Sequence, residues 1–158
     1  MPAAGERAAR LAEVGWTLPT PPQPLGQYTT AVRAGSALIV SGMLPLDAER
    51  PAVVGRRGEE RTVDEGRHAA ELAALNALAV AAQAAGGLDR VGRLLRLTVF
   101  MTTTPPFTAH AAVADGASAV FAALFAEPHT RLALGAYTLP LGATVVVDTI
   151  FELSDEAR

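Results

Sequence analysis

Five segments of the chain are rich in the aliphatic and β-branched residues that strands favour. They are residues 28–33, 36–42, 93–101, 131–138 and 144–153. Only Ala34-Gly35 separates the first two, and this spacing predicts a tight hairpin. The last two stand on either side of LPLGA, in which Pro140 and Gly142 indicate a turn. We expect a second hairpin there, centred on Pro140-Leu141, in which position 146 would lie opposite about position 135.

Two long segments between these strands show the spacing of amphipathic helices. Thr62 and Glu65 form a capping-box pattern at the start of the first, and Gly86-Gly87 ends it, which predicts a helix over 63–85. The second spans 107–125, although Gly116 weakens its middle. Its inward residues are expected to be Val113, Val120, Leu124 and either Phe121 or Phe125.

The remaining segments are expected to form an N-terminal arm and a surface loop. Residues 5–14 can form a short helix, and the proline-rich stretch after it is expected to lie extended on the surface. Residues 45–61 mix proline, glycine and charges of both signs, as a solvated loop does. We therefore expect one domain over residues 1–158, of which 1–24 form an N-terminal helix and arm.

The order of elements is ββαβαββ, which predicts an α+β sandwich of two layers, with two helices on one face of a mixed sheet. That arrangement leaves the other face of the sheet without a cover. Because the strands are hydrophobic on both faces, we expect subunits to pack sheet against sheet. The pattern alone thus predicts an oligomer.

Composition narrows the function classes. The 158 residues include no cysteine, which removes disulfides and thiolate chemistry, and no sequence pattern suggests a metal site or a cofactor. A net charge of −3, with arginine as the only strongly basic residue type, argues against a nucleic-acid partner. The N-terminal residues carry charge throughout and do not resemble a signal peptide, and no segment reads as a membrane span. A cytoplasmic protein is expected.

One guanidinium stands at the head of an apolar strand. Arg131 begins the run RLALGAYTLPLGATVVVDTIFEL, where an unpaired charge is costly. The sequence leaves two explanations open. Arg131 either meets an anionic ligand or forms a structural ion pair at a subunit interface.

Four stretches in register resemble one known family. They are PLGQYTTAVRAGSALIVSGMLPLD, LDRVGRLLRLTVFM, HTRLALG and LPLGATVVVDTIFEL, and together they cover about Leu18 to Leu153. In this order they resemble the Rid/YjgF family, also described as endoribonuclease L-PSP, and more closely a longer bacterial subgroup of it. The resemblance implies a chorismate-mutase-like homotrimer with clefts between neighbouring subunits. Its best-understood members hydrolyse enamines and imines such as 2-aminoacrylate to 2-keto acids and ammonia.

The resemblance also assigns roles to residues. Arg131 matches the carboxylate-binding arginine of the family, which can hold a ligand by two parallel hydrogen bonds. Tyr28, together with Ser41 and Gly42, matches residues that line the cleft, and Asp115 falls near an asparagine of active members. From the residues alone, Tyr28 could equally be a packing residue, Ser41 a hydroxyl bonded to the backbone, and Asp115 an ordinary surface residue.

The sequence departs from the family pattern at two positions. Val146 stands where the deaminases carry a glutamate that positions or protonates water and substrate, and Met43 replaces the glutamine of Ser-Gly-Gln. The first departure removes the obvious general acid and base. His129, two residues before Arg131, is the remaining candidate for proton transfer, unless it is an ordinary surface residue. Asp148 faces the same side of its strand as Val146, but lies roughly 7 Å further along.

Three functions follow from these residues. The first is an enamine/imine deaminase, a hydrolase in which Arg131 holds the substrate and His129 assists. The second is a binding or regulatory trimer that senses a small carboxylate and has lost catalysis with Val146. The third, a ribonuclease, is disfavoured by the acidic balance and the lack of a histidine pair. Since the expected hairpin would keep Arg131 roughly 13 Å from position 146 along the strand, we expect two subunits to contribute to each cleft.

Overall fold

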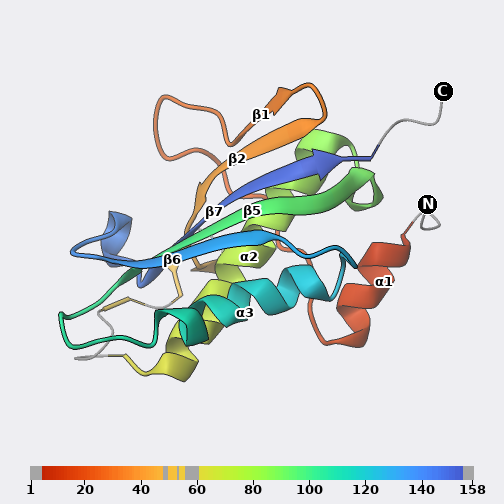
Figure 1. Ribbon diagram of the computed structural model, residues 1–158. Coiled ribbons are helices and arrows are strands. Elements are labelled where there is room, and N and C mark those ends of the chain that lie inside the picture. The colour runs from red at the N-terminus through yellow and green to blue at the C-terminus, as the bar shows by residue number, and fades with distance from the viewer. Residues whose placement is uncertain (1–4, 48–49, 53, 56–60, 155–158) are drawn as a thin grey trace.

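A five-stranded mixed sheet and two long helices make up most of this protein, as a computed structural model shows for residues 5–47, 50–52, 54–55 and 61–154 (Figure 1). The elements are α1 (Glu6–Glu13), β1 (Ala31–Ala34), β2 (Ala37–Met43), β3 (Leu46–Asp47), β4 (Arg50–Pro51), α2 (Val63–Ala85), η1 (Leu88–Arg90), β5 (Val91–Thr102), α3 (His110–Ala122), β6 (Thr130–Ala136), η2 (Pro140–Gly142) and β7 (Val145–Leu153). This order confirms the predicted ββαβαββ sandwich, preceded by the short helix α1.

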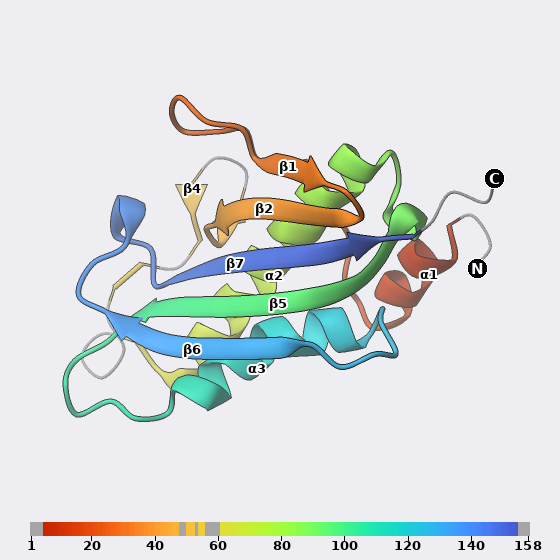
Figure 2. The ribbon, with the colours of Figure 1, turned by 45° about the horizontal axis from the view of Figure 1, so that its top comes forward.

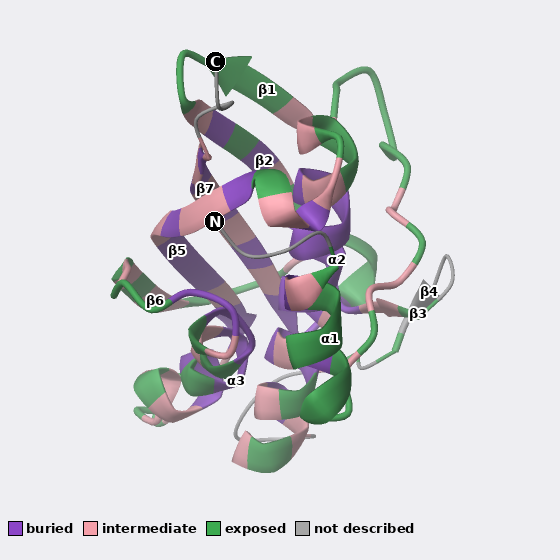
Figure 3. Ribbon diagram, turned by 90° about the vertical axis from the view of Figure 1, so that its right-hand side faces the viewer, coloured by how far each residue is buried: buried purple, intermediate pink, exposed green. Residues whose placement is uncertain are grey.

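The sheet has the strand order β1-β2-β7-β5-β6, and α2 and α3 both cover the same face of it (Figures 1 and 2). β5 and β6 run parallel because α3 connects them as a crossover helix, whereas the other neighbouring pairs are antiparallel. The purple residues of Figure 3 gather where the sheet meets α2 and α3, so the core lies between the two layers.

The expected hairpin between the last two strands is wrong. β5 lies between β6 and β7, and it pairs with both. Position 146 is therefore level with Phe100 and Leu134, and not opposite Gly135 on an adjacent strand. The reason is that the turn at Pro140 leads away from β6 to the far side of β5, so neighbours in sequence are not neighbours in the sheet.

Smaller corrections concern element ends. The first hairpin turns at Gly35-Ser36, one residue later than expected, because Ala34 pairs with Ala37. The helix expected over 107–125 is shorter. Val113, Val120 and Leu124 are buried as expected, and both Phe121 and Phe125 are buried where only one of them was expected to be. In the loop expected over 45–61, β3 and β4 form a short ladder, while residues 48–49, 53 and 56–60 lie outside the described part of the chain.

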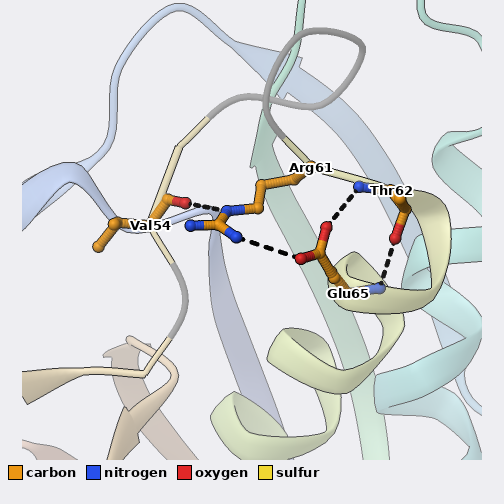
Figure 4. A network of polar contacts seen from close by, with 4 residues as sticks. All are labelled: Val54, Arg61, Thr62 and Glu65. Carbon is orange, nitrogen blue, oxygen red and sulfur yellow. Dashed lines mark hydrogen bonds and ion pairs between the residues drawn. The ribbon is translucent and has the colours of Figure 1, made fainter.

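Local chemistry fixes the position of α2. The predicted capping box is present: the Glu65 amide donates to the Thr62 hydroxyl, and the Thr62 amide donates to the Glu65 carboxylate (Figure 4). Arg61 joins this carboxylate to the carbonyl of Val54 and so ties the loop to the helix (Figure 4). The hydrogen bond from the Thr62 amide is the main reason why the pKa of Glu65 is lowered.

Gly116 has a packing function that the sequence did not indicate. A Cβ at this position would collide with the backbone of Arg67, so the missing side chain lets α3 lie directly against α2. Alanines on α2 serve the same close approach, since those at 69, 70, 73, 74 and 77 have no exposed surface. The glycine that weakens α3 as an isolated helix therefore allows the packing that holds its residues beside β6.

No helix among the described residues covers the second face of the sheet (Figure 2). Along β7 the residues alternate strictly between buried and half-buried, and Val146, Asp148, Ile150 and Glu152 point to the uncovered face. On the same face, Val32 and Ile39 are 53% and 45% exposed. Such an apolar surface is typical of a protein-protein contact. In the described part of the chain, no helix has both the length and the apolar character to span a bilayer.

Candidate functional site

Arg131 lies near the start of β6 and points toward α3. Its side chain is on the helix-covered face, because β6 pairs Arg131 with the fully buried Leu97 of β5. One terminal nitrogen, Nη1, donates to Asp115 Oδ1 at 2.7 Å and to Ser118 Oγ at 3.1 Å. The side chain of Arg131 is 26% exposed and that of Asp115 is 53% exposed. An ion pair with Asp115 of the same chain thus orients Arg131.

His129 belongs to the same group of side chains. Its Nε2 lies 3.1 Å from Ser118 Oγ, and its ring packs edge-on against Phe121, with the ring centroids 6.3 Å apart. Burial is the main cause that lowers the pKa of His129, and the positive charge of Arg131 lowers it further. The neutral ring therefore predominates at pH 7. We call Asp115, Ser118, His129 and Arg131 the arginine cluster.

A separate cavity of 430 Å³ opens on the uncovered face of the sheet. The described residues that line it are Pro22, Gln23, Leu25, Tyr28, Thr30, Gly42, Met43, Leu44, Leu46, Phe100, Leu139, Pro140 and Val146. None of them carries a charge. This cavity can therefore accept an apolar group, with the hydroxyls of Tyr28 and Thr30 among its few polar atoms.

Val146 and Gly42 form the floor of this cavity. A Cβ on Gly42 would lie 2.9 Å from Val146 Cγ1, so the glycine leaves room for the valine. Asp148 points to the same face two residues further along β7. Its pKa is raised by burial, an effect that Arg96 partly offsets. Asp148 is not among the residues that line the cavity.

The other two predicted residues differ in their placement. Tyr28 lines the cavity, is 49% exposed, and accepts a hydrogen bond from the amide of Leu25 at its hydroxyl oxygen. Ser41 donates its hydroxyl hydrogen to the carbonyl of Thr29 at 2.8 Å, and it is not among the lining residues. Ser41 therefore matches the second interpretation left open by the sequence, a hydroxyl bonded to the backbone.

The predicted site residues thus fall into two groups on opposite faces of the sheet. Arg131 is level with Leu97 and Thr149, whereas Val146 is level with Phe100 and Leu134. The two rows are three residues apart along the strands, so their side chains point in opposite directions. Three residues and two strand spacings separate the two α-carbons by about 10 Å in each direction. Within the described part of the chain, Arg131 is therefore on the other face of the sheet from the cavity at Val146, and it is not among the residues that line that cavity.

Several residues of these two groups have no marked signal in the sequence. Ser118 is one of many small residues on α3, and only the fold brings it to Arg131 and His129. Pro22, Gln23 and Leu25 come from the proline-rich arm, which lines the cavity as well as lying on the surface. Among the described residues, no three histidine or acidic side chains are grouped closely enough to hold a metal ion.

Comparison with protein families finds one model that matches residues 8–153, with the description "YjgF/chorismate_mutase-like, putative endoribonuclease". Among curated proteins, the chain is similar to Protein TCP17 of Trypanosoma cruzi, with 39% identity over 156 residues. The match covers 97% of this chain and 98% of that protein. The similarity therefore extends over both proteins nearly from end to end.

Solved structures resemble the fold to different degrees. A Shewanella oneidensis protein with the same endoribonuclease description superposes with a TM-score of 0.89 at 32% identity, covering 93% of this chain and 99% of that one. TdcF from E. coli, solved with bound serine, gives a TM-score of 0.61 at 25% identity, covering 85% of this chain and 94% of that one. The first similarity includes most of both chains, and the second identifies a more distant relative with a small ligand.

Proposed function

Since this chain belongs to the YjgF/chorismate mutase-like family, we propose that it binds small 2-oxo and 2-imino carboxylates in clefts between the subunits of a homotrimer, and hydrolyses the imines slowly to 2-keto acids and ammonia. The observation that carries this proposal is the state of Arg131. Both hydrogen bonds that hold its guanidinium use Nη1. Within the described part of the chain, the edge formed by Nε and Nη2 has no partner and can receive a carboxylate in a bidentate manner.

The nature of the ligand follows from the chemistry of this edge. A guanidinium matches the planar geometry of a carboxylate, and it does so best when its own position is fixed. Asp115 and Ser118 provide that fixation. The serine bound to TdcF is a small amino acid with a free carboxylate, which supports the same ligand class here.

We expect hydrolysis to be slow because the cavity at Val146 has an uncharged lining. None of the described residues that line the cavity is charged, so the cavity lining offers no carboxylate to protonate or deprotonate a substrate. This observation also favours the alternative function, a binding or regulatory trimer without turnover. Isothermal titration calorimetry with pyruvate tests binding, and ammonia release from 2-aminoacrylate generated in situ tests turnover. Binding without turnover would support the alternative, and lack of both would contradict the proposal.

The homotrimer gives a prediction of its own. Because Arg131 and the cavity lie on opposite faces, a cleft that uses both needs a second copy of the chain, packed through the uncovered sheet face. Sedimentation equilibrium at micromolar concentration is expected to give the mass of three chains. Ile39→Glu, which places a charge on the uncovered face, should dissociate the trimer, while Val14→Glu on the opposite layer should not. A wild-type monomer would refute this assembly.

Asp115 holds Arg131 in position, but its negative charge is expected to lower the affinity of Arg131 for a carboxylate ligand. Its negative charge lies beside the guanidinium and repels a second carboxylate. Asp115→Asn keeps an oxygen that accepts from Arg131 but removes that repulsion, which is worth on the order of 1 kcal/mol at a partly exposed site. Pyruvate affinity should rise about 5-fold. Asp64→Asn, on the exposed first turn of α2, is the matched control and should leave the affinity unchanged, as measured by the same calorimetry.

A further inference from the structure

Ser118 connects the two functional side chains of the arginine cluster. Its hydroxyl oxygen lies 3.1 Å from Arg131 Nη1 and 3.1 Å from His129 Nε2. A guanidinium can only donate hydrogen bonds, so Ser118 accepts from Arg131. In the tautomer of the neutral imidazole that carries its proton on Nδ1, Nε2 accepts the hydrogen of Ser118. In that tautomer the hydroxyl points from the arginine toward the histidine.

This orientation suits proton transfer beside a ligand on Arg131. Ser118 and His129 are both half-buried, so water can reach them, whereas Ala117 and Phe121 on the neighbouring face of α3 are buried in the core. A hydroxyl that already donates to a base still has a lone pair with which it can accept a proton. On the facing elements, α3 presents Ser118 and Phe121 to the imidazole, and β6 presents the charged group Arg131.

We propose that Ser118 and His129 form the proton-transfer pair for imine hydrolysis at Arg131, in place of the carboxylate that Val146 removes. The proposal rests on the proposed function, since it requires a 2-imino carboxylate bound by Arg131. It assigns catalysis to a hydroxyl and an imidazole on the helix-covered face of the sheet, away from the apolar cavity.

The step is balanced without any further reactant. Water adds to the C=N carbon of the protonated imine, and a C–O bond forms as the C=N π electrons move to nitrogen. The water proton passes to Ser118 Oγ while the hydroxyl proton of Ser118 passes to His129 Nε2. The proton then returns by the same route to the amino nitrogen. The C–N bond breaks as the electrons of the carbinolamine O–H bond form the carbonyl, and the hydroxyl proton passes through Ser118 to His129, which gives it to the released ammonia. The products are a 2-keto acid and ammonium, and His129 is neutral again.

The pH dependence has a defined direction. His129 acts as a base, so it must be neutral before water attacks. The rate should therefore rise with pH through the pKa of His129 and stay level above it. Because burial and the charge of Arg131 lower that pKa, the rise is expected at a lower pH than for an exposed histidine, and the pair is active at neutral pH.

Three variants test the pair with 2-aminoacrylate generated in situ as the substrate. His129→Gln should lower kcat about 100-fold with little change in KM, because general-base catalysis contributes roughly 10² to 10⁴ in rate. The rise with pH should disappear as well. Ser118→Ala should lower kcat similarly, and Ser118→Thr, which keeps the hydroxyl, should restore much of it. His110→Gln on the N-terminal turn of α3 is the control and should keep the wild-type profile.

The outcomes distinguish a failure of the Ser118–His129 pair from a failure of carboxylate binding at Arg131. If His129→Gln keeps the wild-type kcat and pH profile, the pair has no part in proton transfer. If the wild type binds pyruvate but does not accelerate ammonia release, the pair is likewise refuted while carboxylate binding stands. If the wild type neither binds nor reacts, the proposed function itself fails. Circular dichroism melting of each variant shows whether a loss of rate reflects unfolding.

Discussion

Arg131→Ala is expected to lower the affinity for pyruvate at least about 100-fold, because each hydrogen bond to a charged group contributes about 1.5 to 3 kcal/mol and a bidentate carboxylate makes two. The fold should survive the change. Arg131 begins an edge strand and its ion-pair partner Asp115 is 53% exposed, so the remaining carboxylate can be solvated by water. Isothermal titration calorimetry with pyruvate measures the effect.

Two further variants make this result specific. Arg131→Lys keeps the positive charge but lacks the planar fork, so it should recover only part of the affinity. Arg10→Ala removes an equal charge from an exposed ion pair on α1 and should leave binding unchanged. Full pyruvate affinity in Arg131→Ala would show that Arg131 serves only its ion pair with Asp115. The sequence left a structural ion pair open but placed it at a subunit interface, whereas this pair lies within one chain.

The second large effect is expected at Val146. Val146→Glu should raise the turnover of 2-aminoacrylate about 100-fold or more, because it supplies a positioned carboxylate for proton transfer. The apolar surroundings should raise the pKa of the new carboxyl toward neutrality, where a general acid and base is most effective. Pyruvate affinity should stay roughly constant or fall slightly, since the new charge repels the ligand and Arg131 is untouched.

Val146→Gln is the matched control for this gain. The amide has nearly the same shape as the carboxyl but cannot transfer a proton, so its turnover should stay at the wild-type level. Gly42 is kept in both variants, because any side chain there would crowd position 146. If the wild type already reaches the rate of an active family member, Val146 is not the limiting feature. His129 and Asp148 are then the first residues to exchange.

The two predictions probe different faces of the sheet. Arg131 belongs to the helix-covered face and Val146 to the uncovered one. A gain of turnover in Val146→Glu that also requires Arg131 would therefore indicate that two chains share one cleft. Subunits that carry both Arg131→Ala and Val146→Glu should then gain turnover when they exchange into trimers with wild-type subunits, because a mixed trimer combines Arg131 of one chain with the new carboxylate of another. Such a result would show that turnover depends on contact between two subunits.

Much of the fold could be predicted from local sequence. The capping box of Thr62 and Glu65 sets the start of α2, and the left-handed Gly86 ends it, because both depend only on residues within one or two turns. The alternating burial of β7 follows from its own period of two. The order ββαβαββ came from these periods.

The pairing of the strands could be predicted from the sequence only in part. A strand, a helix and another strand at 93–138 form a βαβ unit, which favours the parallel neighbours β5 and β6. The short link through Pro140 instead suggested a hairpin, since tight turns usually join adjacent strands. In the structure β5 lies between β6 and β7, and its consecutive residues 97–99 are buried, as is typical of a central strand.

The sequence by itself therefore determined which segments form helices and strands, and it showed that Arg131 needs a partner and that position 146 lacks a carboxylate. Only the tertiary structure decided that Asp115, Ser118 and His129 are the partners of that guanidinium, and that Val146 points to the other face. The physical reason is that side-chain direction in a strand follows a local period of two, whereas the residues it meets depend on which strand and helix pack beside it. That packing is set by burial over the whole core and cannot be read from any one segment.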